Sequence, residues 1–163
     1  MVKVRPFKGL LANQDNVGRV ISPAYDTLNT VEARAMADGN EMSFLNVNKP
    51  EITMAEDQDP YADEVYARGR ENLLHFVEHG YLVQDTEERM YIYQQTMGDH
   101  TQFGLIGLAS VDDYEQNRIK RHELTLAKKE ADRTKLTDVQ SANVGPVFLT
   151  FRENQDVIKT RMS

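Results

Sequence analysis

Hydrophobic and polar positions along the chain predict a succession of helices and strands. The clearest element is a helix over 60–79, whose apolar side chains recur every three or four residues on one stripe: Ala62, Val65, Tyr66, Gly69, Leu73, Phe76 and Val77. Asp59 is suited to cap this helix, Pro60 to begin it and Gly80 to end it. Such a stripe must pack against another layer, which we expect to be a β-sheet.

Two apolar runs in the middle of the chain predict that sheet. They cover 90–96 and 101–111, and the residues between them, Met97-Gly98-Asp99-His100, have the composition of a hairpin turn. The second run is apolar almost throughout, which is typical of a central strand covered on both faces. Gly104 and Gly107 inside it indicate close packing.

Shorter patterns predict the other elements. Asn29 or Thr30 is suited to cap a helix that ends at Ala37, before Gly39. A second polar helix is expected over 128–143, with Leu136, Val139 and Asn143 on one side. The remaining runs predict strands over 2–11, 20–21, 43–48 and 146–151, and a helix over 156–163. We therefore expect an α/β (α+β) fold with a mixed sheet and packed helices, as a single domain over 1–163.

Composition excludes several classes of function. The 163 residues include no cysteine, so disulfides, thiolate metal sites and sulfur nucleophiles are excluded. The formal net charge of −7 argues against general nucleic-acid binding. No apolar run has the length of a membrane span, and Arg5, Pro6 and Lys8 interrupt any secretory signal, so we expect a cytoplasmic protein without membrane contact.

One segment stands out by its charge. Residues 118–135 hold seven Lys or Arg side chains and three acidic ones, a local charge of +4 that leaves −11 for the rest of the chain. His122 and Glu123 precede the predicted helix at a strand end, where ligand-binding loops often emerge. They are suited to transfer protons, while Lys128, Lys129 and Arg133 are suited to hold a phosphate or carboxylate. The alternative is a solvated helix face.

A second candidate is the loop over 22–26. Ser22 and Pro23 favour an extended turn, after which Tyr25 and Asp26 follow directly. The loop is either a simple turn closed by Asp26 or a carrier of both side chains into a cleft, with Asp26 as a base or a metal ligand. Because both candidate segments lie at predicted strand ends, we expect 22–26 and 122–133 to be neighbours in space.

The segment His75-Phe76-Val77-Glu78-His79 matches the HxxEH pattern of some zinc peptidases. Two imidazoles fill only half of a tetrahedral site, and His79 lies in the last helical turn, where the helix dipole alone favours histidine. We therefore predict no metal site here.

Seven segments, taken in order, resemble the N-terminal part of the prokaryotic family called domain of unknown function 1015. They are VKVRPFKGL, ISPAYDTL, SFLNVNKPE, DPYADEVYARGRENL, YIYQQTM, IKRHELTLAKKEADRTKLTD and GPVFLTFR, and they span Met1 to about Arg152. The family has no settled activity. Its members are usually much longer, so the resemblance implies the N-terminal fragment of a longer protein.

A more distant resemblance is to the ParB and sulfiredoxin superfamily, which includes partition nucleotidases and free-serine kinases. It is carried by ISPAYD, GLIGLASVDDYE and HELTLAKKEADR. The phosphate-binding box of that superfamily, Gly-x-Arg-Arg or His-Gly-x-His-Arg, has no counterpart after 90–96.

These observations predict an enzyme domain that binds a small anionic metabolite or a nucleotide, with phosphoryl transfer, for example to serine, as the reaction class. Asp26, His122 and Glu123 are the expected catalytic residues, and Ser22, Tyr25, Lys128 and Arg133 the expected ligand-binding residues. ATP or ADP with Mg²⁺ is the expected cofactor. The alternative is a regulatory module that docks an acidic partner through 118–135.

Overall fold

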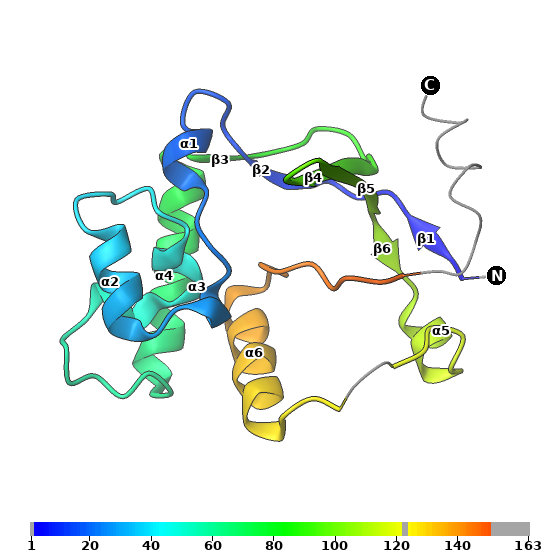
Figure 1. Ribbon diagram of the computed structural model, residues 1–163. Helices are drawn as coiled ribbons and strands as arrows, with labels where there is room; N and C mark the ends of the chain where they lie inside the picture. The colour runs from blue at the N-terminus through cyan, green and yellow to red at the C-terminus, as the bar shows by residue number, and fades with distance from the viewer. Residues whose placement is uncertain (1, 122–123, 151–163) are drawn as a thin grey trace.

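The structure is a computed structural model that describes residues 2–121 and 124–150 (Figure 1). Its helical side and its strand-rich side lie apart in Figure 1, with α6 between them. In chain order the elements are β1 (Val4–Arg5), β2 (Leu10–Ala12), α1 (Val17–Val20), the 3₁₀ helix η1 (Tyr25–Thr27), α2 (Thr30–Ala37), α3 (Leu45–Asn48), the 3₁₀ helix η2 (Pro50–Thr53), α4 (Asp63–Glu78), β3 (Leu82–Gln84), β4 (Tyr91–Met97), β5 (His100–Ile106), β6 (Leu108–Ala109), α5 (Val111–Glu115) and α6 (Ala127–Gln140).

Helix α4 confirms the predicted apolar stripe but begins three residues later than Pro60. Asp59 caps a turn instead of the helix, because its carboxylate accepts the amide of Tyr61 at 3.0 Å. Gly80 ends the helix as predicted, with a φ of +69° that favours glycine. Five residues of the stripe are buried: Val65, Tyr66, Gly69, Leu73 and Phe76.

The expectation that this stripe packs against a sheet holds only in part. Helix α4 lies mainly against α6, α3 and η2, while Leu73 and Phe76 pack with Leu82 of the short strand β3. The close approach of α6 occurs at Gly69, where an added Cβ atom would lie 3.0 Å from Gln140 Nε2 and 3.2 Å from Leu136 Cδ1. Glycine thus sets the distance between the two helices.

Two clusters of buried side chains form the core. The larger contains Val20, Val47, Leu73, Phe76 and Leu82, and the smaller contains Ala33, Leu45 and Ile52. Helix α3 contributes to both, because Leu45 enters the smaller cluster and Val47 the larger one. This sharing ties α2 and η2 to α4.

The predicted strand over 43–48 is therefore wrong. Its alternation of apolar and polar residues comes from one short helix that faces two clusters, and this pattern resembles the period of a strand. The predicted strand end at 20–21 is wrong as well, since Val20 belongs to α1. The helix over 30–37 is confirmed, with Asn29 and Glu32 forming a capping box.

The described strands form three separate two-stranded sheets, all antiparallel: β1 with β6, β2 with β3, and β4 with β5. The mixed α/β class is confirmed, and the predicted strand over 2–11 divides into β1 and β2. The β4–β5 hairpin is confirmed too, running from Tyr91 opposite Ile106 to Met97 opposite His100.

Strand β5 is not a covered central strand, which corrects the expectation drawn from its apolar run. Leu105 is 63% exposed and Phe103 50% exposed, and β4 is its one described partner strand. Close packing is confirmed at Gly107, where a Cβ atom would lie 2.8 Å from Val4 Cγ1. At Gly104 an added Cβ atom would lie 3.8 Å from Tyr93 Cβ, which is an ordinary van der Waals contact.

Helix α5 was not predicted, because its residues are mostly polar. Its Asp113 is buried and accepts the backbone amide of Lys3 at 2.7 Å and the Arg118 guanidinium at 2.5 Å. These two hydrogen bonds lower the pKa of Asp113, the bond from Lys3 most strongly. Arg118 of the basic segment therefore stabilises the junction of β1 and α5.

Helix α6 confirms the second predicted polar helix, but it ends at Gln140, followed by Ser141 in the left-handed conformation with φ 52°, instead of at Asn143. Residues 146–150 are exposed and form no strand, so the prediction for 146–151 is wrong over its described part. The predicted helix over 156–163 lies outside the described residues. Among the helices described, not one combines the length and apolarity needed to cross a bilayer.

Candidate functional site

The candidate site lies where α6 meets η1 and the segment that joins α3 to η2. Its central contact places the Arg133 guanidinium 4.2 Å from the centre of the Tyr25 ring. Stacking of this kind suits the flat guanidinium group, whose edge remains available for hydrogen bonds. Two segments about 100 residues apart in sequence thus meet through these side chains.

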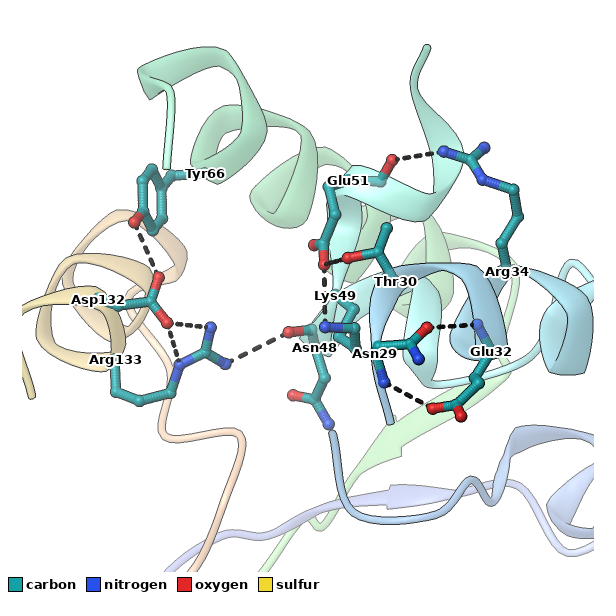
Figure 2. A network of polar contacts seen from close by, with 10 residues as sticks. All are labelled: Asn29, Thr30, Glu32, Arg34, Asn48, Lys49, Glu51, Tyr66, Asp132 and Arg133. Atoms are coloured by element: carbon teal, nitrogen blue, oxygen red, sulfur yellow. Dashed lines mark hydrogen bonds and ion pairs between the residues drawn. The ribbon is translucent and has the colours of Figure 1, made fainter. Parts of the chain in front are cut away.

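The remaining contacts of Arg133 fix its direction (Figure 2). Its Nε and Nη2 atoms donate to Asp132 Oδ2 at 2.9 and 2.6 Å, and Nη1 donates to the carbonyl of Asn48 at 3.3 Å. Three of the five guanidinium N–H groups have partners among the described residues, and the other two have no described partner.

Asp132 links this arginine to α4. Its Oδ1 accepts the hydroxyl of Tyr66 at 2.8 Å, as Figure 2 shows. Burial and this bond to a carboxylate raise the pKa of Tyr66, burial being the larger cause. Tyr66 therefore remains a neutral donor, and the chain of contacts from Tyr66 to Tyr25 joins α4, α6 and η1.

A second polar group lies beside the first, on the other side of Asn48 (Figure 2). Lys49 Nζ lies 3.0 Å from Glu51 Oε1, and Thr30 donates to the same oxygen at 3.4 Å. Glu51 is buried, so its charge depends on Lys49 for compensation. The pair holds η2 against the start of α2.

The N-terminal half of α6 presents two exposed lysines. Lys128 lies over the ring of Tyr61 with Nζ 4.3 Å from its centre, and Lys129 is exposed beside it. Among the described residues, no side-chain hydrogen bond caps the helix at Leu126. The charges of these lysines therefore add to the positive end of the helix dipole at the start of α6.

The last lysine of the basic segment is structural. Lys135 contacts the ring of Tyr66 and pairs with Asp63, which lowers the pKa of the Asp63 carboxyl through that hydrogen bond and charge. It joins the C-terminal half of α6 to the start of α4.

The predicted site residues are distributed as follows. Tyr25 and Arg133 are in direct contact. Ser22 is half-buried in the loop before η1, Asp26 is exposed within η1, and Lys128 lies further toward the start of α6. His122 and Glu123 lie outside the described residues.

Sequence reasoning missed Asn48, Tyr61, Tyr66 and Asp132. Tyr66 stood on the apolar stripe of α4 and was assigned to the core, although its hydroxyl needs a partner when the ring is buried. The need of a buried tyrosine hydroxyl for a partner, together with the Asp132-Arg133 pair on a polar helix, is the sequence signal by which this network could have been found.

The histidines of α4 form a stacked pair at the end of the helix. The rings of His75 and His79 have centroids 3.9 Å apart, and His79 Nδ1 lies 2.9 Å from the carbonyl oxygen of His75. Within the described ranges, no three His, Asp or Glu side chains are grouped so as to hold a metal ion.

We expect protein purified without chelators to carry only trace zinc, because two imidazoles leave a tetrahedral ion half coordinated. Elemental analysis of the unmodified chain and of His79→Ala tests this, with His100→Ala in the hairpin turn as the control. Near-stoichiometric zinc that disappears only in His79→Ala would contradict the prediction.

Comparison with known proteins gives one match. A sequence model of the family described as "Protein of unknown function (DUF1015)" matches residues 4–163. No curated protein and no solved structure matches the chain.

Proposed function

This chain belongs to the DUF1015 family of proteins of unknown function, and we propose that it binds a small phosphate-bearing metabolite or a nucleotide at the N-terminal half of α6. The observation that carries the proposal is the stacking of Arg133 on Tyr25. It places a charged group, two of whose donors have no described partner, beside the loop that contains Ser22 and Asp26.

The charges around this contact favour a compact anion. Lys128 and Lys129 stand in the first turn of α6, where the helix dipole and the first amide groups of the helix also attract negative charge. Arg133 lies one to two turns further along the same helix and supplies a planar donor. A phosphate group matches this combination in size and charge.

Phosphoryl transfer is the reaction class we propose for this site. Asp26 is exposed in η1, in the segment adjoining the Tyr25 ring, and would act as the base that accepts a proton from the attacking hydroxyl. His122 and Glu123 precede α6 in sequence and are the further candidates for proton transfer. Lys128 and Arg133 would hold the phosphate oxygens and stabilise their charge in the transition state.

ATP or ADP with Mg²⁺ is the cofactor considered for this reaction. In the part of the chain that the structure describes, carboxylates do not converge in threes near η1 or elsewhere. These residues do not fit a magnesium site built by the protein alone, and we derive no step through the ion.

The docking alternative is less well supported by the distribution of charge. Arg118, Arg133 and Lys135 each have an aspartate partner, at Asp113, Asp132 and Asp63. Arg121 lies over the ring of Tyr114. Much of the local charge is thus engaged within the molecule, and Lys120, Lys128 and Lys129 are the cations of this segment with no described acidic or aromatic partner apart from the contact of Lys128 with Tyr61.

Titration calorimetry with inorganic phosphate, ADP and ATP tests the proposal. We expect Lys128→Gln and Lys129→Gln to weaken binding by about tenfold each, since a charge-assisted hydrogen bond contributes roughly 1.5–3 kcal/mol. Lys120→Gln, in the same segment but outside α6, is the matched control. Equal losses in all three variants would indicate a diffuse electrostatic effect and contradict the site.

Turnover is tested separately from binding. With ATP or ADP and a panel of hydroxyl metabolites that includes serine, Asp26→Asn should abolish phosphate transfer while it preserves nucleotide binding. Binding without transfer in the unmodified chain would restrict the function to ligand binding.

Duplex DNA distinguishes a phosphate site from a polyanion surface. We expect no sub-micromolar binding at physiological salt, because the rest of the chain carries −11 and repels a polyanion. Tight, salt-sensitive binding of duplex DNA would contradict this expectation.

A further inference from the structure

A concave surface separate from the α6 site lies beside α3 and η2. It is a cleft of about 800 Å³ formed by side chains of α1, α2, α3, η2 and α4 and by the turn 38–41. Its volume is in the range of small-molecule sites, about 300–1,000 Å³. We propose that this cleft binds a small zwitterion with one carboxylate and one ammonium group, of the class of α-amino acids and short peptides.

Arg34 is the fixed cation of the cleft. Its Nη1 donates to the carbonyls of Ile52 and Met54 at 2.6 and 3.0 Å, and its Nη2 donates to the carbonyl of Glu51 at 3.2 Å (Figure 2 shows the last of these). All three partners are neutral, and among the described residues no carboxylate forms an ion pair with Arg34. The guanidinium is thus held in position with its charge uncompensated, which suits it to a carboxylate.

The acidic groups of the cleft belong to the turn that comes after α2 in the sequence. Asp38 and Glu41 both line it, and neither pairs with a described Lys, Arg or His side chain. Among the described contacts, the Glu41 carboxylate accepts one long bond of 3.4 Å, from the hydroxyl of Tyr81. These carboxylates are suited to receive an ammonium group.

The balance of charge decides between classes of ligand. Arg19 and Arg34 supply two positive charges and Asp38 and Glu41 two negative ones, with His75 counted as neutral. A doubly charged anion would meet as much repulsion as attraction, whereas a zwitterion finds partners for both of its groups. This distinguishes the cleft from the cationic end of α6.

Amide side chains complete the walls. Asn72 donates to the carbonyl of Asn46 at 2.7 Å, and Asn46 donates to the carbonyl of Glu41 at 3.0 Å. Because these bonds use the NH₂ groups, the amide oxygens remain as acceptors for a ligand. Ile52 and Phe76 lie at the floor of the cleft but are almost fully buried, so the half-buried Ala37 supplies apolar surface that an aliphatic side chain would cover.

Calorimetry of the full chain at pH 7, where an ordinary α-amino group is still mostly protonated, tests the proposal with four probes. L-leucine and L-leucyl-L-leucine keep both charges, N-acetyl-L-leucine lacks the ammonium group, and L-leucinamide lacks the carboxylate. We expect at least one of the two zwitterions to bind and each single-charge analogue to bind at least about tenfold more weakly. The relative affinity of the first two probes separates an amino-acid site from a peptide site.

Variants locate the binding. Arg19→Gln and Asp38→Asn change charge at exposed positions without removing a described hydrogen bond. Each should weaken the binding of the zwitterion by about tenfold. Arg68→Gln, exposed on α4 and outside the cleft, should have no effect, and Lys128→Gln should affect phosphate only. Failure of both zwitterions to bind at millimolar concentration, equal binding of an analogue, or unchanged affinity in Arg19→Gln and Asp38→Asn would overturn the proposal.

Discussion

Replacing Phe76 by alanine is expected to lower the free energy of unfolding by roughly 3–5 kcal/mol. The side chain is 1% exposed and lies in the larger core cluster. Its ring meets those of Phe44 and Tyr81 edge to face, at centroid distances of 6.2 and 5.6 Å. The substitution therefore removes buried apolar surface and leaves a cavity that these two rings border.

Urea denaturation followed by circular dichroism measures this loss. Leu74→Ala is the matched control, because Leu74 is on the same helix and 47% exposed. We expect its effect to be within about 1 kcal/mol, as for other partly exposed positions. A similar loss in both variants would show that Phe76 is not a central core residue.

Replacing Gly69 by valine should destabilise the chain by about 1–3 kcal/mol and weaken phosphate binding as well. A Cβ atom at this position would lie 3.1 Å from Pro50 Cγ, in addition to its close contacts with Gln140 and Leu136 of α6. Proline is rigid and Leu136 is buried, so relief requires that α6 move away from α4. Such a movement also displaces Arg133 from Tyr25.

The control for this variant is Ala67→Val, an exposed position of the same helix that changes only the intrinsic helix preference. Thermal unfolding gives the stability of both variants, and phosphate titration gives the effect on the site. If Gly69→Val is as stable as Ala67→Val, α4 and α6 are not in close contact at this position.

Local chemistry made part of this fold predictable. The capping box at Asn29 and Glu32, the glycine at position 80 and the turn between β4 and β5 each depend on a few neighbouring residues. These local patterns are recognisable in the sequence because they do not depend on tertiary contacts. The helix over 30–37 was identified at its observed bounds, whereas α4 begins three residues later and β5 ends five residues earlier than predicted.

Tertiary context explains the errors. The pattern of 43–48 reflects two core clusters on opposite sides of one short helix, and no local rule distinguishes that arrangement from a strand. The apolar run of β5 predicted burial, but burial depends on which elements lie against it. Neither fact is encoded within the segment itself.

The candidate site was likewise predictable only in part from the sequence. Charge and position drew attention to Tyr25 and Arg133, which the structure places in contact. The contacts that hold Arg133 in place come from Asp132, Tyr66 and a main-chain carbonyl, and these become visible only when α4 and α6 are assembled. Residues suited to a ligand were thus easier to find than residues that position them.

The exposed β4–β5 hairpin is expected to open independently of the helical core. An isolated two-stranded hairpin is only marginally stable in water, and described contacts with the rest of the chain cluster at its base, where the Tyr91 hydroxyl meets Gly9 and Asp85. Its amide hydrogens are therefore expected to exchange with solvent through local opening, while those of α4 exchange only when the core unfolds. The helical half that contains both proposed ligand sites then keeps its structure through fluctuations of the strands.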